Sequence, residues 1–154
     1  MIWFLSLLAA WLLFNFLAPL SLLAFAQPMS LGRIPADILE AAKAHKVRFF
    51  DAHLARGLAF STWLGTSHAV VLNRSLLERA YPAQIRFILA HELAHCQLGH
   101  LRLRWLLTVS GAILVPAVAR WFRGKEEEAD LLAERLSGLP RSILSDRKLA
   151  ANET

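Results

Sequence analysis

The sequence predicts an α+β domain over residues 31–141 that follows an apolar segment at residues 1–26. Three short runs with β-branched or aromatic content, at residues 47–50, 58–62 and 68–72, predict a small antiparallel sheet. Stretches with the apolar spacing of helices lie before and after these runs. A sheet and helices segregated along one chain are typical of an α+β fold.

The segment at residues 1–26 contains no charged side chain. At 1.5 Å per residue, it is long enough as a helix to cross a hydrocarbon layer of about 30 Å. The alternative is a cleaved signal peptide, because Ala24-Phe25-Ala26 matches an Ala-x-Ala cleavage site. A signal peptide normally opens with Lys or Arg, which this segment lacks, so the sequence favours an uncleaved transmembrane anchor. The nearest basic residues follow the segment, and they predict a single-pass anchor with the domain in the cytoplasm.

The composition supports contact with lipid. The hydrophobic fraction is 56% and the formal net charge is +5, whereas ordinary soluble domains are about 45–50% apolar. The basic residues are scattered or flank apolar segments, an arrangement that suits anionic lipid head groups. They form no basic stripe of the kind that binds nucleic acid, so we expect membrane lipid and no nucleic acid as a partner. The single cysteine, Cys96, excludes an intramolecular disulfide.

Helix signals surround the predicted strands. Residues 31–46 have the apolar spacing of an amphipathic helix. Asn73 or Ser75 is expected to cap a short helix through Arg79. Pro82 then opens a longer helix at its first turn, where a proline is tolerated.

This longer helix contains the sequence His91-Glu92-Leu93-Ala94-His95. Histidines four residues apart lie on one face of a helix, so both can bind one zinc ion. Glu92 directly follows the first histidine, and this position suits a general base acting on zinc-bound water. Burying these polar groups without a metal would cost several kcal/mol. His100 lies about 140° round a continuous helix from His95. It is expected to be either a helix-end residue or an outer partner that supports the site, and not a zinc ligand.

A catalytic zinc needs a third protein ligand and an open position for water. The run Glu126-Glu127-Glu128-Ala129-Asp130 supplies an acidic ligand on a later helix. With Glu126 as the ligand, Asp130 lies one turn further along the same face and can accept the second ring N–H of a ligating histidine. We therefore predict one zinc ion per chain, bound by His91, His95 and Glu126. Gly138 is expected to end the helix.

Residues 105–119 form an apolar insert within the domain. The insert is short for a membrane span. A single crossing would also place His91 and His95 on one side of the membrane and Glu126 on the other. The insert is therefore either a buried core helix or a hairpin that dips into the membrane with Gly111 near its bend. A polar tail over residues 142–154 ends the chain.

The sequence resembles the HtpX-type and CAAX-prenyl-endopeptidase-type membrane zinc metallopeptidases, which are gluzincins. The resemblance is carried by His91-Glu-Leu-Ala-His95 with His100 five places on, by Glu126-x-x-Ala-Asp130, and by the run at residues 69–77. It implies a zincin-like fold, the same zinc ligands, and Glu92 as the base in cleavage of membrane or misfolded proteins. The remaining roles it implies are a supporting Asp130 and an edge strand for a peptide substrate, formed by His68, Ala69, Val70 and Val71.

The chain departs from this family after Asp130, because no His or Tyr follows to stabilise the oxyanion. Arg135 and Arg141 are the candidates for that role. Two alternatives remain beside a quality-control endopeptidase. One is a regulatory membrane metallopeptidase of the β-lactam sensor type, and the other is a non-catalytic membrane module stabilised by zinc. The sequence indicates neither the cleaved substrate nor the oligomeric state.

Overall fold

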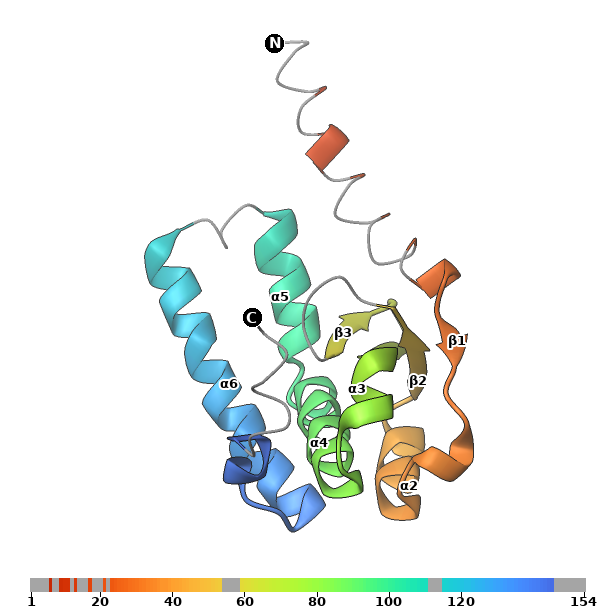
Figure 1. The fold of residues 1–154 in the computed structure, drawn as a ribbon. Helices are drawn as coiled ribbons and strands as arrows, with labels where there is room; N and C mark the ends of the chain where they lie inside the picture. The colour runs from red at the N-terminus through yellow and green to blue at the C-terminus, as the bar shows by residue number, and fades with distance from the viewer. Residues whose placement is uncertain are drawn as a thin grey trace.

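A computed structural model of the chain describes residues 6, 9–11, 13, 17, 21, 23–53, 59–110 and 115–145. Its described part is an α+β fold with one four-stranded sheet (Figure 1). The strands are β1 (Gln27–Pro28), β2 (Val47–Ala52), β3 (Ala59–Trp63) and β4 (His68–Asn73). The helices are η1 (Leu31–Arg33), α2 (Ala36–Ala44), α3 (Arg74–Arg79), α4 (Pro82–Gln97), α5 (His100–Val109), α6 (Pro116–Ser137) and η3 (Arg141–Ser145).

The sheet has the strand order β1-β2-β4-β3 and is mixed. Strand β4 pairs with β3 in antiparallel and with β2 in parallel orientation, with Val47 opposite His68. The prediction of a purely antiparallel sheet is therefore wrong. A tight loop around Gly65, whose φ is +82°, forces β3 and β4 into a hairpin. Strand β4, and not β3, then returns alongside β2, and this pairing makes β4 an interior strand.

Most of the local helix signals are confirmed. The helix predicted over residues 31–46 is shorter, since η1 is separate and α2 begins after Pro35 and ends at Ala44. The Asn73 side chain caps α3 by accepting a hydrogen bond from the backbone N–H of Ser75 (3.2 Å). Pro82 occupies the first turn of α4. Helix α6 ends at Gly138, whose φ of +70° is the left-handed conformation typical of a helix C-terminus.

Helix α4 lies in the centre of the fold, in contact with the sheet on one side and with α6 on another. Its side chains Phe87, Leu89 and Leu93 are completely buried, as is the β4 stretch from residue 69 to residue 72. A helix that is buried almost all round is held in place by close packing on every side. Polar side chains on α4 therefore have a rigid support.

The insert at residues 105–119 is divided between two helices. Helix α5 ends at Val109 and α6 begins at Pro116, while residues 111–114, with the expected bend at Gly111, lie outside the described residues. Leu106 is 56% exposed and Val115 is 49% exposed. The alternative of one buried core helix is therefore wrong. We call the described residues on either side of this gap, 105–110 and 115–121, the insert hairpin.

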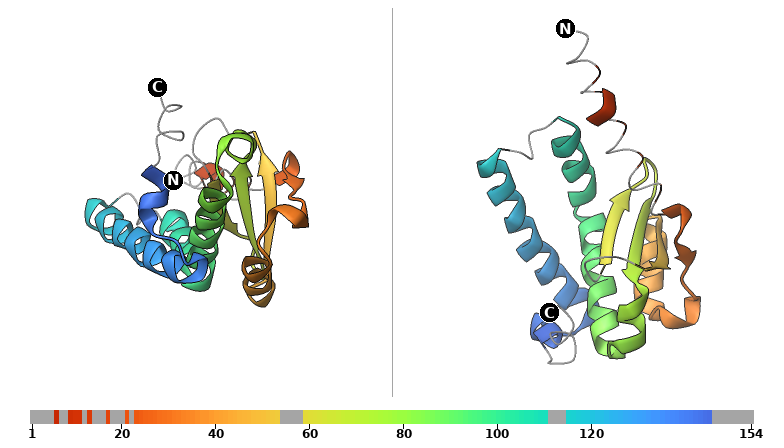
Figure 2. Two further views of the ribbon diagram at one scale, coloured as in Figure 1. Left: turned by 60° about the horizontal axis from the view of Figure 1, so that its bottom comes forward. Right: turned by 45° about the horizontal axis from the view of Figure 1, so that its top comes forward.

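The described N-terminal residues extend toward the same side of the molecule as the insert hairpin (Figure 1; Figure 2, right). The indole N–H of Trp11 donates a hydrogen bond to the backbone carbonyl of Thr108 in α5 (3.3 Å). Most of the predicted anchor at residues 1–26 and most of the tail lie outside the described residues. Within the described part of the chain, no helix is both long enough and apolar enough to cross a bilayer.

Candidate metal centre

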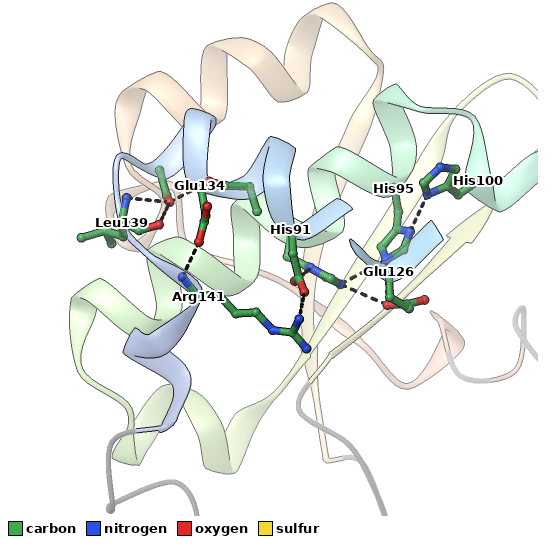
Figure 3. Close-up of polar contacts among 10 residues, drawn as sticks. His91, His95, His100, Glu126, Glu134, Leu139 and Arg141 are labelled. Carbon is green, nitrogen blue, oxygen red and sulfur yellow. Dashed lines mark hydrogen bonds and ion pairs between the residues drawn. The ribbon is translucent and has the colours of Figure 1, made fainter. Parts of the chain in front are cut away.

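Helices α4 and α6 bring His91, His95 and Glu126 together, with their side chains pointing toward one another (Figure 3). The Nε2 atoms of the two histidines are 3.1 Å apart. The Oε2 atom of Glu126 lies 3.3 Å from Nε2 of His95 and 3.5 Å from Nε2 of His91. Zinc bonds of about 2.0–2.1 Å give a tetrahedral site an edge of about 3.3 Å. The three atoms therefore fit three corners of one zinc tetrahedron.

Small side chains on α6 set this geometry. Ala129 and Ala133 are completely buried where α6 meets α4. Residues three, four and seven positions apart share one face of a helix, so Glu126 and Asp130 lie on the same face as these alanines. Close approach of the two helices then brings both carboxylates within reach of the α4 histidines.

Asp130 holds the second ring nitrogen of His91. Nδ1 of His91 lies 2.9 Å from Oδ1 of Asp130, whose other oxygen is 2.8 Å from the guanidinium of Arg141. A neutral His91 that donates from Nδ1 presents the lone pair of Nε2 to a metal. The nearly buried Asp130 carboxylate thus selects the tautomer that a ligand needs, and Arg141 balances its charge.

Glu92 lies beside the metal-binding group and lines both of its neighbouring cavities. Burial raises the pKa of the Glu92 carboxyl, and the negative charge of Glu126 acts in the same direction. A hydrogen bond from the Ser61 hydroxyl and the charges of His91 and Arg104 oppose this rise in pKa. A carboxyl whose charged form is partly disfavoured is suited to take up and release a proton.

Two cavities flank the metal-binding group and share Ala59, His91, Glu92 and Glu126 in their walls. One has a volume of about 280 Å³ and extends toward α5. The other has a volume of about 390 Å³ and extends toward η3. An extended chain bound along β3 would therefore have space on both sides of the metal.

The strand that lines this cleft is β3, through Ala59, Phe60 and Ser61. The predicted substrate strand at residues 68–71 belongs to β4, which is hydrogen-bonded to strands on both sides. The prediction that His68, Ala69, Val70 and Val71 form an edge strand is therefore wrong. The unbroken apolar run in β4 was the available signal, because it is typical of an interior strand covered on both faces.

The arginines near the site differ from those predicted. Arg135 is exposed and lines neither cavity, and Arg141 lines the larger cavity with its charge paired to Asp130. Arg104 of α5, which the sequence reasoning missed, lines the smaller cavity. Among the described residues, Arg104 forms no ion pair, unlike Arg74, Arg86 and Arg141. Its positive charge is therefore available to a substrate in the cavity. Such a cation can stabilise negative charge that develops on a substrate oxygen.

Cys96 takes no part in the metal-binding group. Its thiol is buried and donates to the backbone carbonyl of Glu92 (3.2 Å). Burial raises the pKa of the Cys96 thiol to about 12. A protonated, buried thiol acts as a small packing side chain.

A model of peptidase family M48 matches residues 30–137. The chain belongs to peptidase family M48. The matched range includes α4, the insert hairpin and the acidic motif of α6, and it confirms the predicted resemblance to HtpX-type and CAAX-prenyl-endopeptidase-type enzymes. No curated protein matches the chain significantly. Membership of this metal-dependent family supports a metallopeptidase function, and the His91, His95 and Glu126 group is the site that can hold the metal.

Proposed function

We propose that the chain is a zinc metalloendopeptidase, with His91, His95 and Glu126 as ligands and Glu92 as general base. The observation that carries this proposal is the spacing of the three donor atoms, which lie 3.1–3.5 Å apart at the wall of a cleft. The family match supports peptide hydrolysis as the reaction. Space on both sides of the site supports cleavage within a chain and not at its end.

The roles of the side chains follow from their positions. A bound zinc would lower the pKa of a coordinated water to about 7 and polarise the scissile carbonyl. Glu92 takes the water proton and delivers it to the leaving amine, while Ser61 orients the Glu92 carboxylate. The outer edge of β3 is unpaired among the described strands, so an extended substrate can add to it through backbone hydrogen bonds.

We expect the detergent-solubilised full chain to cleave unfolded casein and to lose this activity when a chelator removes its zinc. Adding back zinc should restore cleavage, because the ligands belong to a pre-formed site. The measurement is the rate at which new amino termini appear, together with the zinc content. Bound zinc without cleavage would instead favour a non-catalytic membrane module, and cleavage by the zinc-free protein would contradict the proposal.

We also propose that the chain is a single-pass membrane protein with the domain facing the cytoplasm and substrates among membrane or misfolded proteins. The uncharged segment at residues 1–26 supports an anchor. The insert hairpin supports a second lipid contact, since it exposes Leu106, Val115 and Trp121. Tryptophan and arginine near the ends of apolar segments are typical of a membrane interface. Arg102, Arg104 and Arg123 flank the hairpin, and Arg120 lies close to its end.

Lipid contact of the insert hairpin predicts a difference between two exposed leucines. Leu106 and Leu131 are 56% and 59% exposed, but only Leu106 belongs to the hairpin. We expect a fluorophore on Leu106→Cys to be quenched by nitroxide-labelled lipid in vesicles, and one on Leu131→Cys to be unaffected. Wild-type protein, whose only thiol is the buried Cys96, gives the blank. Equal quenching of both labels would contradict insertion of the hairpin.

A further inference from the structure

His100 lies behind the candidate zinc ligand His95, on the side away from the metal-binding group. The ring of His100 is 3% exposed, and its Nδ1 is 3.1 Å from Nδ1 of His95 (Figure 3). Its other nitrogen, Nε2, lies 3.4 Å from Oε2 of Glu128 on α6. Lys125 forms an ion pair with the same Glu128 carboxylate. A continuous polar path therefore leads from His95 to a carboxylate at the surface.

A break between two helices gives His100 this position. Helix α4 ends at Gln97, and Gly99 adopts a φ of +71° before α5 begins at His100. On an uninterrupted helix, His100 would lie about 140° round from His95. A Cβ on Gly99 would meet no atom within 4 Å, so the left-handed conformation, and not lack of space, favours glycine here.

The distances constrain the ring protons. Two Nδ1 atoms 3.1 Å apart form a good hydrogen bond only if one of them carries the proton. A His95 that binds zinc through Nε2 must carry its proton on Nδ1, so it is the donor and His100 the acceptor. The single proton of a neutral His100 then lies on Nε2, which faces Glu128.

We propose that His100 and Glu128 are positioning residues that hold His95 in the tautomer and orientation needed to bind zinc. This inference rests on the proposed zinc site. In this arrangement, α6 supports both histidines of α4. Asp130 contacts His91 directly, and Glu128 contacts His100, which in turn contacts His95. His100 is not a fourth ligand, because Nδ1 faces His95 and Nε2 faces Glu128.

The test compares two substitutions in the full chain whose side chains have the same number and branching of non-hydrogen atoms. Asparagine can place an amide oxygen near the position of the imidazole Nδ1, whereas leucine cannot accept a hydrogen bond. We expect His100→Leu to weaken zinc binding by about 10–100-fold, the usual effect of removing such a partner. The zinc affinity of His100→Asn should stay within a few-fold of the wild-type value. The readout is competition for zinc with a chromophoric chelator.

A second pair of variants tests Glu128. Glu128→Gln should weaken zinc binding several-fold, while Glu127→Gln, the same change on the neighbouring exposed residue, should leave it unchanged. Nitrogen NMR of zinc-loaded wild-type protein provides a readout that needs no substitution: His100 should be protonated on Nε2 and unprotonated on Nδ1.

The outcomes separate the two proposals. Wild-type protein that binds no zinc overturns the proposed function and this inference together. Wild-type protein that binds zinc as tightly as a folded His100→Leu variant overturns the positioning role alone. An NMR spectrum with the His100 proton on Nδ1 also overturns that role, even if the leucine variant does not fold.

Discussion

Replacing Glu92 by glutamine is expected to abolish casein cleavage and to leave one zinc ion bound per chain. Glutamine has nearly the same size and can keep the contact with Ser61, but it cannot take a proton from water. Loss of a general base lowers turnover by about 10²–10⁴-fold. Zinc binding should persist because the three donor atoms that fit the tetrahedron belong to His91, His95 and Glu126. The measurements are kcat on casein and zinc per chain.

Two comparisons make the Glu92 result specific. Glu127→Gln makes the same chemical change at an exposed position of α6 and should retain full activity. A loss of zinc in Glu92→Gln would show that this carboxylate helps to bind the metal. Turnover near the wild-type rate would exclude Glu92 as the base and direct attention to another proton acceptor in the cleft.

The sequence predicted the parts of this site that depend on regular helix geometry. His91 and His95 are four residues apart within one helix, so their common face follows from the helical repeat alone. The same holds for Glu126 and Asp130 on α6. The positions of β2, β3 and β4 were also predictable to within about two residues, because β-branched and aromatic runs bounded by glycines are local signals. Strand β1, at Gln27–Pro28, carries no such signal and was not predicted. In each case the deciding interactions lie within one element.

The errors concern features that depend on how distant elements meet. The parallel pairing of β2 with β4 results from the order of strands in space, which short strands joined by short loops do not reveal. Because the order of the strands in space was unknown, β4 was predicted to be an edge strand. This error left β3 and Ser61 out of the predicted cleft. The direct contact of His100 with His95 was not predicted, because the helical projection continued past Gln97, where α4 ends. Arg104 reaches the cleft only through the direction that α5 takes after Gly99.

Replacing Glu126 by alanine is expected to remove zinc binding and all activity that depends on it. Two imidazoles alone leave half of a tetrahedral site without protein ligands. Removing a hydrogen-bond partner of a ligand weakens metal binding by about 10–100-fold, so we expect the loss of a ligand itself to lower zinc affinity by more than about 100-fold. Zinc that binds only the folded state stabilises it by about 2.7 kcal/mol at 100 times Kd. The wild-type Tm should therefore rise with added zinc, and the Tm of the Glu126→Ala variant should not.

Glu127→Ala is the matched control, because it removes an equal charge from the adjacent exposed position of α6. The Glu126 side chain is 48% exposed, so its truncation should leave the zinc-free fold nearly as stable as wild type. Equal Tm values of both variants without zinc would thus assign any difference with zinc to metal binding. If Glu126→Ala still showed the full zinc-dependent rise in Tm, the third ligand would have to be another residue. The contact between α4 and α6 would then stabilise the fold without supplying that ligand.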